Sequence, residues 1–238
     1  SADETRGRRA DRETAVTGAT TDPTLASTWY IDADSEVVRD FVATHAGHGD
    51  AIERAVRLYY AVRDSIRYDF VAFELTPEVF KASHCLEAEA AVCIPKAIAL
   101  AGAARAAGIP ARLGFADVKN HLASARILSL MDGDVFHWHA YTELFLDGKW
   151  VKATPAFDKA LCERNGVHPL EFDGRGDSIF HEFTGDGRRH MEYVAQHGSF
   201  DDMPYDTIVA DMRRYYPRIL AAMKDDRAAR AGTVRAAG

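Results

Sequence analysis

The segment 135–154 constrains the fold most, because it predicts a β-hairpin whose register is set by its turn. Residues 136–146 are rich in aromatic and branched side chains, which favour a strand. Asp147-Gly148 is typical of a two-residue type I′ turn, and residues 149–154 return as the second strand. The turn predicts four cross-strand pairs: Leu146 with Lys149, Phe145 with Trp150, Glu143 with Lys152, and Tyr141 with Thr154.

Side chains alternate along each strand, so the hairpin has two different faces. One face is predicted to carry polar and aromatic side chains, namely His139, Tyr141, Glu143, Trp150, Lys152 and Thr154. The other carries mainly small and aliphatic side chains, namely Ala140, Thr142, Leu144, Leu146, Val151 and Ala153. The second face is therefore the one expected to cover a core.

An alanine-rich helix is predicted from Cys93 to Ala107. Pro95 is tolerated only in a first helical turn, which fixes the start close to Cys93. Gly108 suits a left-handed cap, and Pro110 prevents continuation. The buried face is predicted from the spacing of four apolar residues, Ile94, Ala97, Ile98 and Ala101.

The remaining pattern is mixed, and with the hairpin and the helix it predicts an α+β fold. Helices are expected at 35–45, capped by Asp34 or Ser35, and at 50–66, capped by Asp50. Short helices with loop are expected at 76–90, a strand at 111–118, loops with a short strand near 191–194 within 160–206, and a helical region at 206–230 that breaks near Pro217. The chain is interpreted as a loose N-terminal arm at 1–22, a single domain at 23–230 and a frayed tail at 231–238.

Composition excludes several classes of protein. The net charge of -7 argues against a general nucleic-acid binder, and 47% apolar residues over 238 are normal for a globular core. No apolar run approaches the roughly 20 residues that cross a bilayer, and the N-terminus has no signal-peptide pattern. Three cysteines are too few and too uneven for a disulfide scaffold, so a reducing, cytoplasmic compartment is expected.

Cys93 is the candidate for chemistry. A thiol at a helix N-terminus lies at the positive end of the helix dipole, which favours the nucleophilic thiolate. The alternative is a small buried cysteine that packs the helix start. In the predicted register His139 lies diagonally across from Thr154, whose hydroxyl could orient an imidazole beside a thiol.

Three segments in order resemble the transglutaminase-like cysteine superfamily, over about residues 53–158. The first is the Cys93 helix with the following Arg105-Ala106-Ala107-Gly108-Ile109-Pro110-Ala111-Arg112. The second is His139 with Glu143 four residues later. The third is Asp147-Gly148-Lys149-Trp150-Val151-Lys152-Ala153-Thr154-Pro155.

The resemblance implies a papain-like core, with the nucleophile at a helix N-terminus packed on an antiparallel sheet. It implies that Cys93 is the nucleophile and His139 the base, and it places Thr154 where the family has aspartate. Asp158 is a second candidate for this third position, although Pro155 interrupts the strand before it. His137 competes with His139 by strand parity, but only His139 has the family spacing.

Other polar residues have simpler interpretations. Glu143 and Lys152 are predicted to form a cross-strand ion pair. Cys85 and Cys162 are predicted to be small buried residues. A zinc site is not expected, because the candidate ligands lack the usual spacing; they are His84, Cys85, Cys93, His137 and His139. No metal and no cofactor is therefore expected.

The resulting hypothesis is a cysteine-dependent enzyme that acts on amide or ester carbonyls through a thioester acyl-enzyme. Water as acceptor would make it a hydrolase or peptidase, and an amine would make it an acyltransferase. The alternative is a catalytically inactive transglutaminase-like binding module, which the missing aspartate favours. The expected partner is a peptide or small molecule with an amide or ester, without nucleic acid or membrane.

Overall fold

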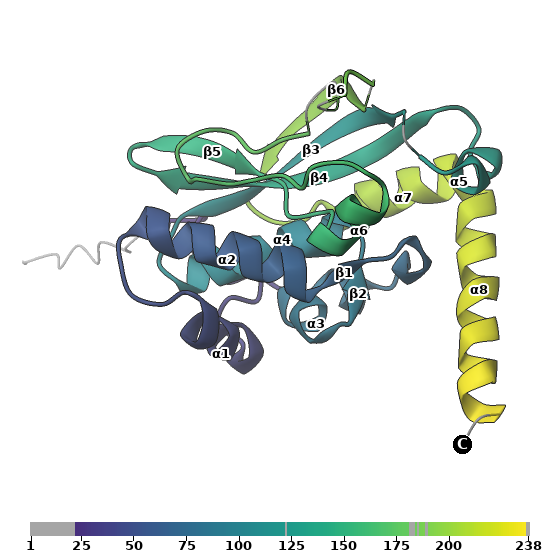
Figure 1. The fold of residues 1–238 in the computed structure, drawn as a ribbon. Helices are drawn as coiled ribbons and strands as arrows, with labels where there is room; N and C mark the ends of the chain where they lie inside the picture. Colours follow the sequence, from purple (N-terminus) through teal and green to yellow (C-terminus); the bar gives the residue numbers. More distant parts are fainter. Residues whose placement is uncertain (1–21, 122, 181–183, 185, 189, 237–238) are drawn as a thin grey trace, which may run out of the picture.

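A four-stranded antiparallel sheet lies on a layer of helices (Figure 1). The computed structural model describes residues 22–121, 123–180, 184, 186–188 and 190–236, with side chains as far as Arg230. The sheet has the order β5-β4-β3-β6, with β3 at Ala111–Asn120, β4 at Val135–Leu146, β5 at Lys149–Ala153 and β6 at Met191–Phe200. This arrangement confirms the predicted α+β class and the strand predicted after Pro110.

The helical layer comes mainly from the first half of the chain. It contains α1 at Glu36–His45, α2 at Ala51–Ser65, α3 at Ala82–Glu87 and α4 at Cys93–Ala106, with the 3-10 helices η1 at Phe70–Ala72 and η2 at Pro77–Phe80. A short parallel pair joins β1 at Arg67–Tyr68 to β2 at Ala90–Ala91. The later helices are α5 at Ala125–Leu130, α6 at Lys159–Arg164, α7 at Tyr205–Tyr215 and α8 at Pro217–Ala236.

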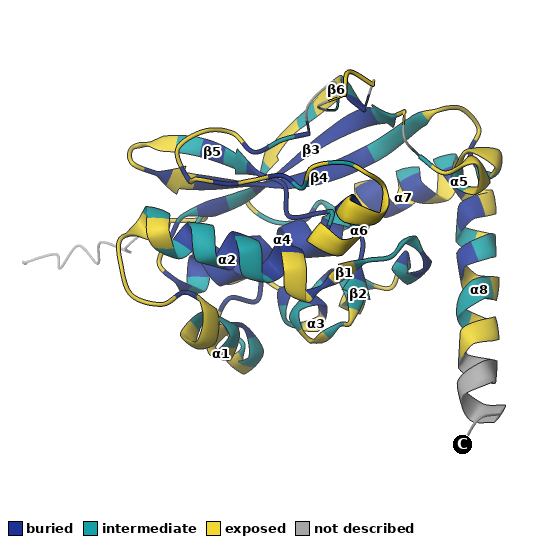
Figure 2. Ribbon diagram, in the orientation of Figure 1, coloured by how far each residue is buried: buried dark blue, intermediate teal, exposed yellow. Residues whose placement is uncertain are grey.

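Helix α4 is the centre of the molecule. It is buried on every side from Ile94 to Arg105, between the sheet and α1 to α3, rather than on the single face that the spacing predicts (Figure 2). Alanine and glycine make this possible because their small side chains let neighbouring elements approach closely. Gly102 is one such place: an added Cβ would lie 2.7 Å from Ala82 Cβ.

Local signals set the helix boundaries as expected. Ser35, not Asp34, caps α1, and its hydroxyl accepts from Val38 N at 3.3 Å. Asp50 caps α2 in a reciprocal capping box with Glu53. These contacts satisfy backbone N–H groups that have no partner inside the helix.

The hairpin register is confirmed along most of its length. Leu146 pairs with Lys149, Phe145 with Trp150 and Glu143 with Lys152. The assigned ladder ends with Thr142 opposite Ala153, so the predicted pair between Tyr141 and Thr154, one step further in the same register, stays a prediction. On the edge of β5 that faces away from β4, the Thr154 N–H donates to Ser178 O at 3.0 Å.

The structure describes almost none of the predicted N-terminal arm and most of the predicted C-terminal tail. The predicted arm at 1–22 lies outside the described residues except for Asp22. The break near Pro217 is confirmed, since α7 ends at Tyr215 and α8 begins at Pro217. Helix α8 continues to Ala236, through most of the segment predicted as a frayed tail. No helix among the described residues has the length and apolar character needed to cross a bilayer.

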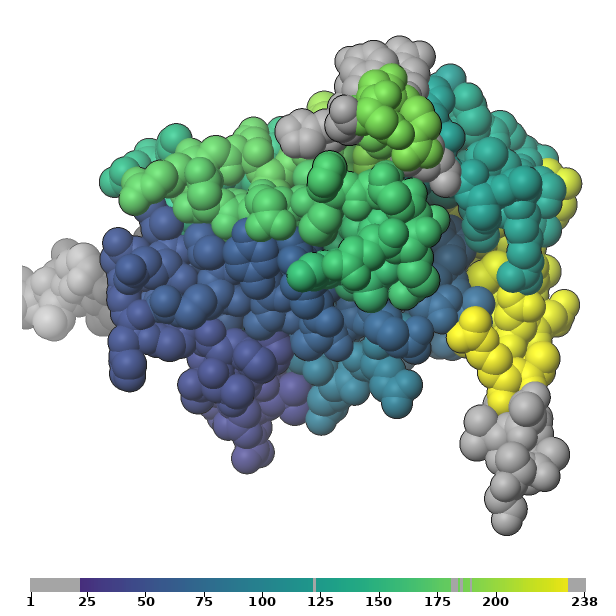
Figure 3. Space-filling view, in the orientation of Figure 1, coloured from purple at the N-terminus to yellow at the C-terminus, as the bar shows by residue number. Residues whose placement is uncertain are grey.

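The segment after β5, in green, lies beside α2, in blue, on the face of the molecule shown in Figure 3. Tyr60 of α2 donates to Glu171 Oε2 at 2.5 Å and accepts from Phe172 N at 3.1 Å. Tyr59 donates to the carbonyls of Thr154 and Leu170, at 3.1 and 3.0 Å. These tyrosines therefore hold the chain that follows the hairpin against the helical layer.

Candidate active site

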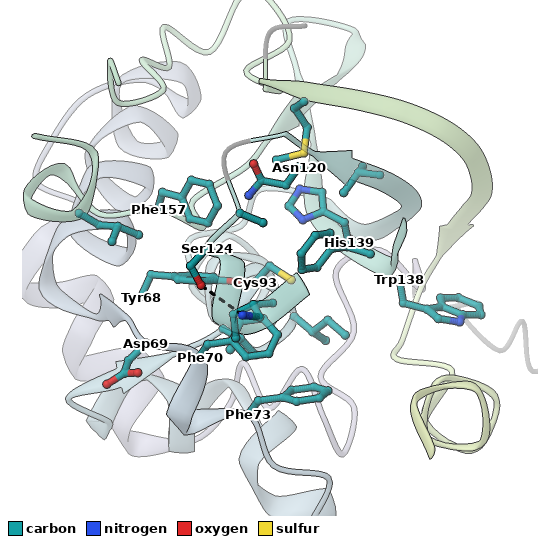
Figure 4. A pocket seen from close by; sticks show the side chains of 18 of the residues that line it. Tyr68, Asp69, Phe70, Phe73, Cys93, Asn120, Ser124, Trp138, His139 and Phe157 are labelled. Carbon is teal, nitrogen blue, oxygen red and sulfur yellow. Dashed lines mark hydrogen bonds between the residues drawn. The ribbon is translucent and has the colours of Figure 1, made fainter. Parts of the chain in front are cut away.

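Cys93 is the first residue of α4 and projects into a cavity (Figure 4). Its predicted position at the helix N-terminus is confirmed, and Val92 before it makes no side-chain cap. Cys93 is half-buried, whereas Cys85 and Cys162 are buried as predicted. All three are free thiols.

A buried lysine fixes the first turn of α4. Lys96 is fully buried, and its ammonium donates to Arg63 O at 2.8 Å and Ile66 O at 2.5 Å, at the C-terminal end of α2. Burial lowers the pKa of Lys96 to about 8. A cation at a helix C-terminus is favourable because the last carbonyls carry partial negative charge. The sequence analysis did not identify this contact, which holds the helix that carries Cys93.

The thiol of Cys93 is kept in its neutral form. Burial raises the pKa of Cys93, and backbone N–H groups of Ala140 and Ile94, which favour the thiolate, only partly oppose this effect. The expectation of a lowered thiol pKa at the helix N-terminus is therefore wrong. The contact with the Ala140 N–H also brings the sulfur against β4, next to His139.

His139 follows a β-bulge in β4. Ala116 pairs with His139 and Val118 with Phe136, so β4 has one more residue than β3 between the two pairs. Trp138, the residue before His139, has a φ of 60°, which is unfavourable for a bulky side chain. The bulge aims His139 and must be held by its neighbours.

Asp117 of β3 holds this bulge. Its carboxylate accepts from Trp138 N at 3.1 Å, and it contacts His137 Nδ1 at 2.9 Å and His197 Nε2 at 2.6 Å. Burial disfavours its charge, but the bonds from His197 and His137 outweigh this, so the pKa of Asp117 is lowered. The Trp138 ring stacks on His197 at 4.1 Å, and its Nε1 donates to Asp211 at 2.8 Å.

His137 is bound into this structural cluster. Its ring contacts Asp117 and stacks on Tyr215 with centroids 4.0 Å apart. Its backbone N–H donates to the hydroxyl of Tyr216. Strand parity predicts that His137 and His139 share one strand face. This prediction is wrong, because the bulge shifts the alternation between the two residues.

His139 lies in an apolar environment. It is 7% exposed and packs against the rings of Phe180 and Tyr193, with centroids at 5.5 and 6.4 Å. Burial lowers the pKa of His139 to about 4, so the imidazole is neutral at pH 7. Within the described part of the chain, its Nε2 is buried without a hydrogen-bond partner.

The two candidates for the third position differ. Thr154 is 1% exposed, and its hydroxyl, like His139 Nε2, has no partner among the described residues. Asp158 is committed to structure: its carboxylate accepts from Tyr68 N at 2.7 Å and caps α6 by accepting from Leu161 N at 2.8 Å. The sequence analysis did not foresee either contact of Asp158.

Glu143 and Lys152 face each other in the ladder but interact with other partners. Glu143 forms its ion pair with Arg112 of β3, and it accepts from the Ser199 hydroxyl at 2.9 Å. The Lys152 ammonium lies 4.9 Å from the centroid of the Tyr141 ring. The predicted Glu143–Lys152 ion pair is replaced because β3 presents arginine directly opposite Glu143.

The cavity that Cys93 and His139 share has a volume of about 400 Å³. Its wall is largely aromatic and aliphatic, with Tyr68, Phe70, Phe73 and Phe157 seen in Figure 4. Phe136 also lines it, so the rings come from three stretches of the chain. Among the described residues, no group of three His, Cys, Asp or Glu side chains is arranged to hold a metal ion. The arrangement offers a thiol, a neutral imidazole and an apolar space beside them.

Comparisons with known proteins give one family match. Residues 39–155 match the family model of the transglutaminase-like superfamily. None of the curated proteins compared matches the sequence.

One solved structure, described as a putative cysteine protease from Cytophaga hutchinsonii, is similar with 16% identity and a TM-score of 0.43. The match covers 76% of this chain and 56% of that one, so this chain corresponds to little more than half of its neighbour. The family match contains Cys93, His139 and Thr154 in one span, and through residues 39–155 the chain belongs to the transglutaminase-like superfamily.

Proposed function

We propose that this protein is a cysteine-dependent enzyme that acts on amide or ester carbonyls through a thioester acyl-enzyme. One observation carries the proposal: the Cys93 thiol and the His139 ring line the same cavity, and the N–H of Ala140, next to His139, contacts the sulfur. Covalent acyl transfer needs a nucleophile and a base within reach of one substrate carbonyl, and a shared cavity supports this.

The reaction starts from a neutral thiol and a neutral imidazole. Cys93 Sγ attacks the carbonyl carbon while His139 accepts the thiol proton, which gives a tetrahedral intermediate. Collapse breaks the bond to the leaving amine or alcohol, which takes the proton from His139. Water or an amine then attacks the thioester, releases the acid or amide, and returns a proton to the Cys93 sulfur.

Thr154 is proposed to orient the ring during this cycle. When His139 accepts the thiol proton both ring nitrogens carry hydrogen, and the buried Nε2–H then needs an acceptor. The Thr154 hydroxyl, which is buried and has no partner among the residues that the structure describes, is the proposed acceptor. The backbone N–H of Cys93 is proposed as an oxyanion donor, since it lies at the helix start.

A binding module without catalysis is the second candidate. It is favoured by the threonine at the family's aspartate position and by the lack of a hydrogen bond from any described residue to His139 Nε2. A neutral imidazole can still act as a base, and Cys93 and His139 line one cavity, so we prefer the enzyme.

Acyl-enzyme formation distinguishes the two. The protein is mixed with 4-nitrophenyl acetate, and intact mass with peptide mapping should find one acyl group on Cys93. Cys93→Ser should remove it, His139→Gln should slow it at least about hundredfold, and Cys85→Ser, which replaces a buried thiol outside the cavity, should leave it unchanged. Wild-type protein that is never acylated would favour the binding module.

The acceptor is tested with the same thioester. Turnover in water alone should release acetate, which would make the enzyme a hydrolase, and an added primary amine captured as an amide would show acyltransfer. Operation without a metal ion and a cytoplasmic location remain part of the proposal.

A further inference from the structure

We propose that the site accepts an uncharged, hydrophobic acyl group, which occupies the aromatic cavity beside Cys93. The inference rests on the proposed function and specifies its substrate class. Ligand pockets typically have volumes of about 300–1,000 Å³ and apolar walls with few polar groups. The cavity of about 400 Å³ is therefore large enough for a medium-length aliphatic or an aryl group.

The aromatic wall is assembled from separate elements. Tyr68 follows α2 and meets Phe157, beyond β5, edge to face with centroids 4.8 Å apart. Phe70 and Phe73 of the next loop pack at 5.6 Å on the lower side (Figure 4). Phe136 of β4 adds a fifth ring to the lining. Rings from distant parts of the chain that surround one space indicate a binding site for apolar matter.

The polar groups of the wall are largely occupied by protein partners. Asp69 is the one carboxylate among the described lining residues, which include no lysine or arginine. Its two oxygens accept from Val71 N and Arg230, both at 2.9 Å. The Ser124 hydroxyl accepts from Ile127 N. Among the described lining residues, no lysine or arginine would offset a carboxylate on the acyl group, which disfavours acidic substrates.

The size of the effect follows from burial of methylene groups. Each methylene transferred from water to an apolar site is worth about 0.8 kcal/mol, which is about fourfold in kcat/KM. From acetyl to hexanoyl 4-nitrophenyl ester, four methylenes should raise the acylation rate of Cys93 about two hundredfold. Mono(4-nitrophenyl) adipate, with the same chain length and a terminal carboxylate, should react at least about tenfold more slowly than the hexanoyl ester.

A matched pair of variants on α5 tests the location. Ile127 lines the cavity, whereas its neighbour Leu128 is 37% exposed and is not among the lining residues. Ile127→Arg should lower the hexanoyl-to-adipoyl rate ratio at least tenfold, because it places a cation in the wall. Leu128→Arg should keep the wild-type ratio.

Two outcomes overturn the inference without affecting the proposed function: acylation of Cys93 that is independent of chain length, or equal changes in Leu128→Arg and Ile127→Arg. If no ester acylates Cys93, the proposed function fails, and calorimetry then tests the pocket itself. Hexanamide should bind wild type at least about tenfold more tightly than acetamide or adipamic acid. Equal or absent binding of the three would overturn the pocket as well.

Discussion

The buried imidazole of His139 should make the stability of the protein fall in mild acid. Burial lowers the pKa of His139 to about 4 in the folded state, from its ordinary value of about 6.5. Below about pH 6.5 the unfolded chain takes up a proton at this residue that the folded protein does not. The unfolding free energy therefore decreases as the pH falls from about 6.5 to about 4, and the contribution is fully present above this window.

The magnitude follows from the size of the shift. At about 1.36 kcal/mol for each pKa unit, the full effect is about 3 kcal/mol, and about 2 kcal/mol of it is lost by pH 5. The perturbation is His139→Gln, which removes the ionisable ring and retains a polar side chain. Urea unfolding of both proteins between pH 4.5 and pH 7.5 measures their unfolding free energies. Subtracting one from the other removes the contributions of the acidic groups that both proteins share.

The absolute stability of His139→Gln is not the readout, because the amide packs differently from the ring. The readout is the slope, since the variant should lose about 2 kcal/mol less than wild type between pH 7.5 and pH 5. The exposed His48 gives the control: His48→Gln should keep the wild-type slope. Parallel curves for wild type and His139→Gln would refute the argument that His139 is neutral and desolvated.

Three further predictions concern the reaction. Iodoacetamide should label Cys93 before the two buried cysteines. The rate of Cys93 labelling should keep rising as the pH increases from 7 to 9, because the pKa of the thiol is raised. Peptide mapping measures the labelling, and a rate that levels off below pH 7 would contradict the prediction. Asp117→Asn should lower kcat about tenfold or more with little change in KM, since it weakens the hold on the bulge that places His139; an increase in KM alone would contradict this role. Thr154→Val should lower kcat about tenfold to a hundredfold without loss of stability, whereas Thr154→Ser should retain activity. A full rate in Thr154→Val with loss in Asp158→Asn, at matched folding, would assign the third position to Asp158.

The backbone of the site could be predicted because short-range rules decide it. Pro95 and Gly108 fix the ends of the α4 prediction to within one residue of the observed helix. The Asp147-Gly148 turn fixes the first pairs of the hairpin. In both cases the residues that determine the structure are adjacent to it in the chain, so no knowledge of distant contacts is needed.

The contact that holds Thr154 could not be predicted because it involves a distant segment. The edge of β5 that faces away from β4 bonds to Ser178, a residue in a loop with weak periodicity. The bulge at Trp138 was missed for the same reason, since it is stabilised by Asp117 and His197 from two other strands. A single acidic residue within the otherwise largely apolar pattern of β3 was the one available signal for it.

The charge state of Cys93 and His139 also depends on residues distant in the sequence. It changes the expected pH profile of the reaction. A helix N-terminus and an adjacent histidine favour a thiolate–imidazolium pair, and both features are present in the sequence. Burial among Phe180, Tyr193 and the aromatic cavity disfavours charge on either partner, and it raises the pKa of Cys93 while lowering that of His139. The competent form, a neutral thiol beside a neutral imidazole, therefore exists over a broad range above about pH 4. The apolar wall that would select the acyl group thus also makes His139 the base that must remove the thiol proton during attack.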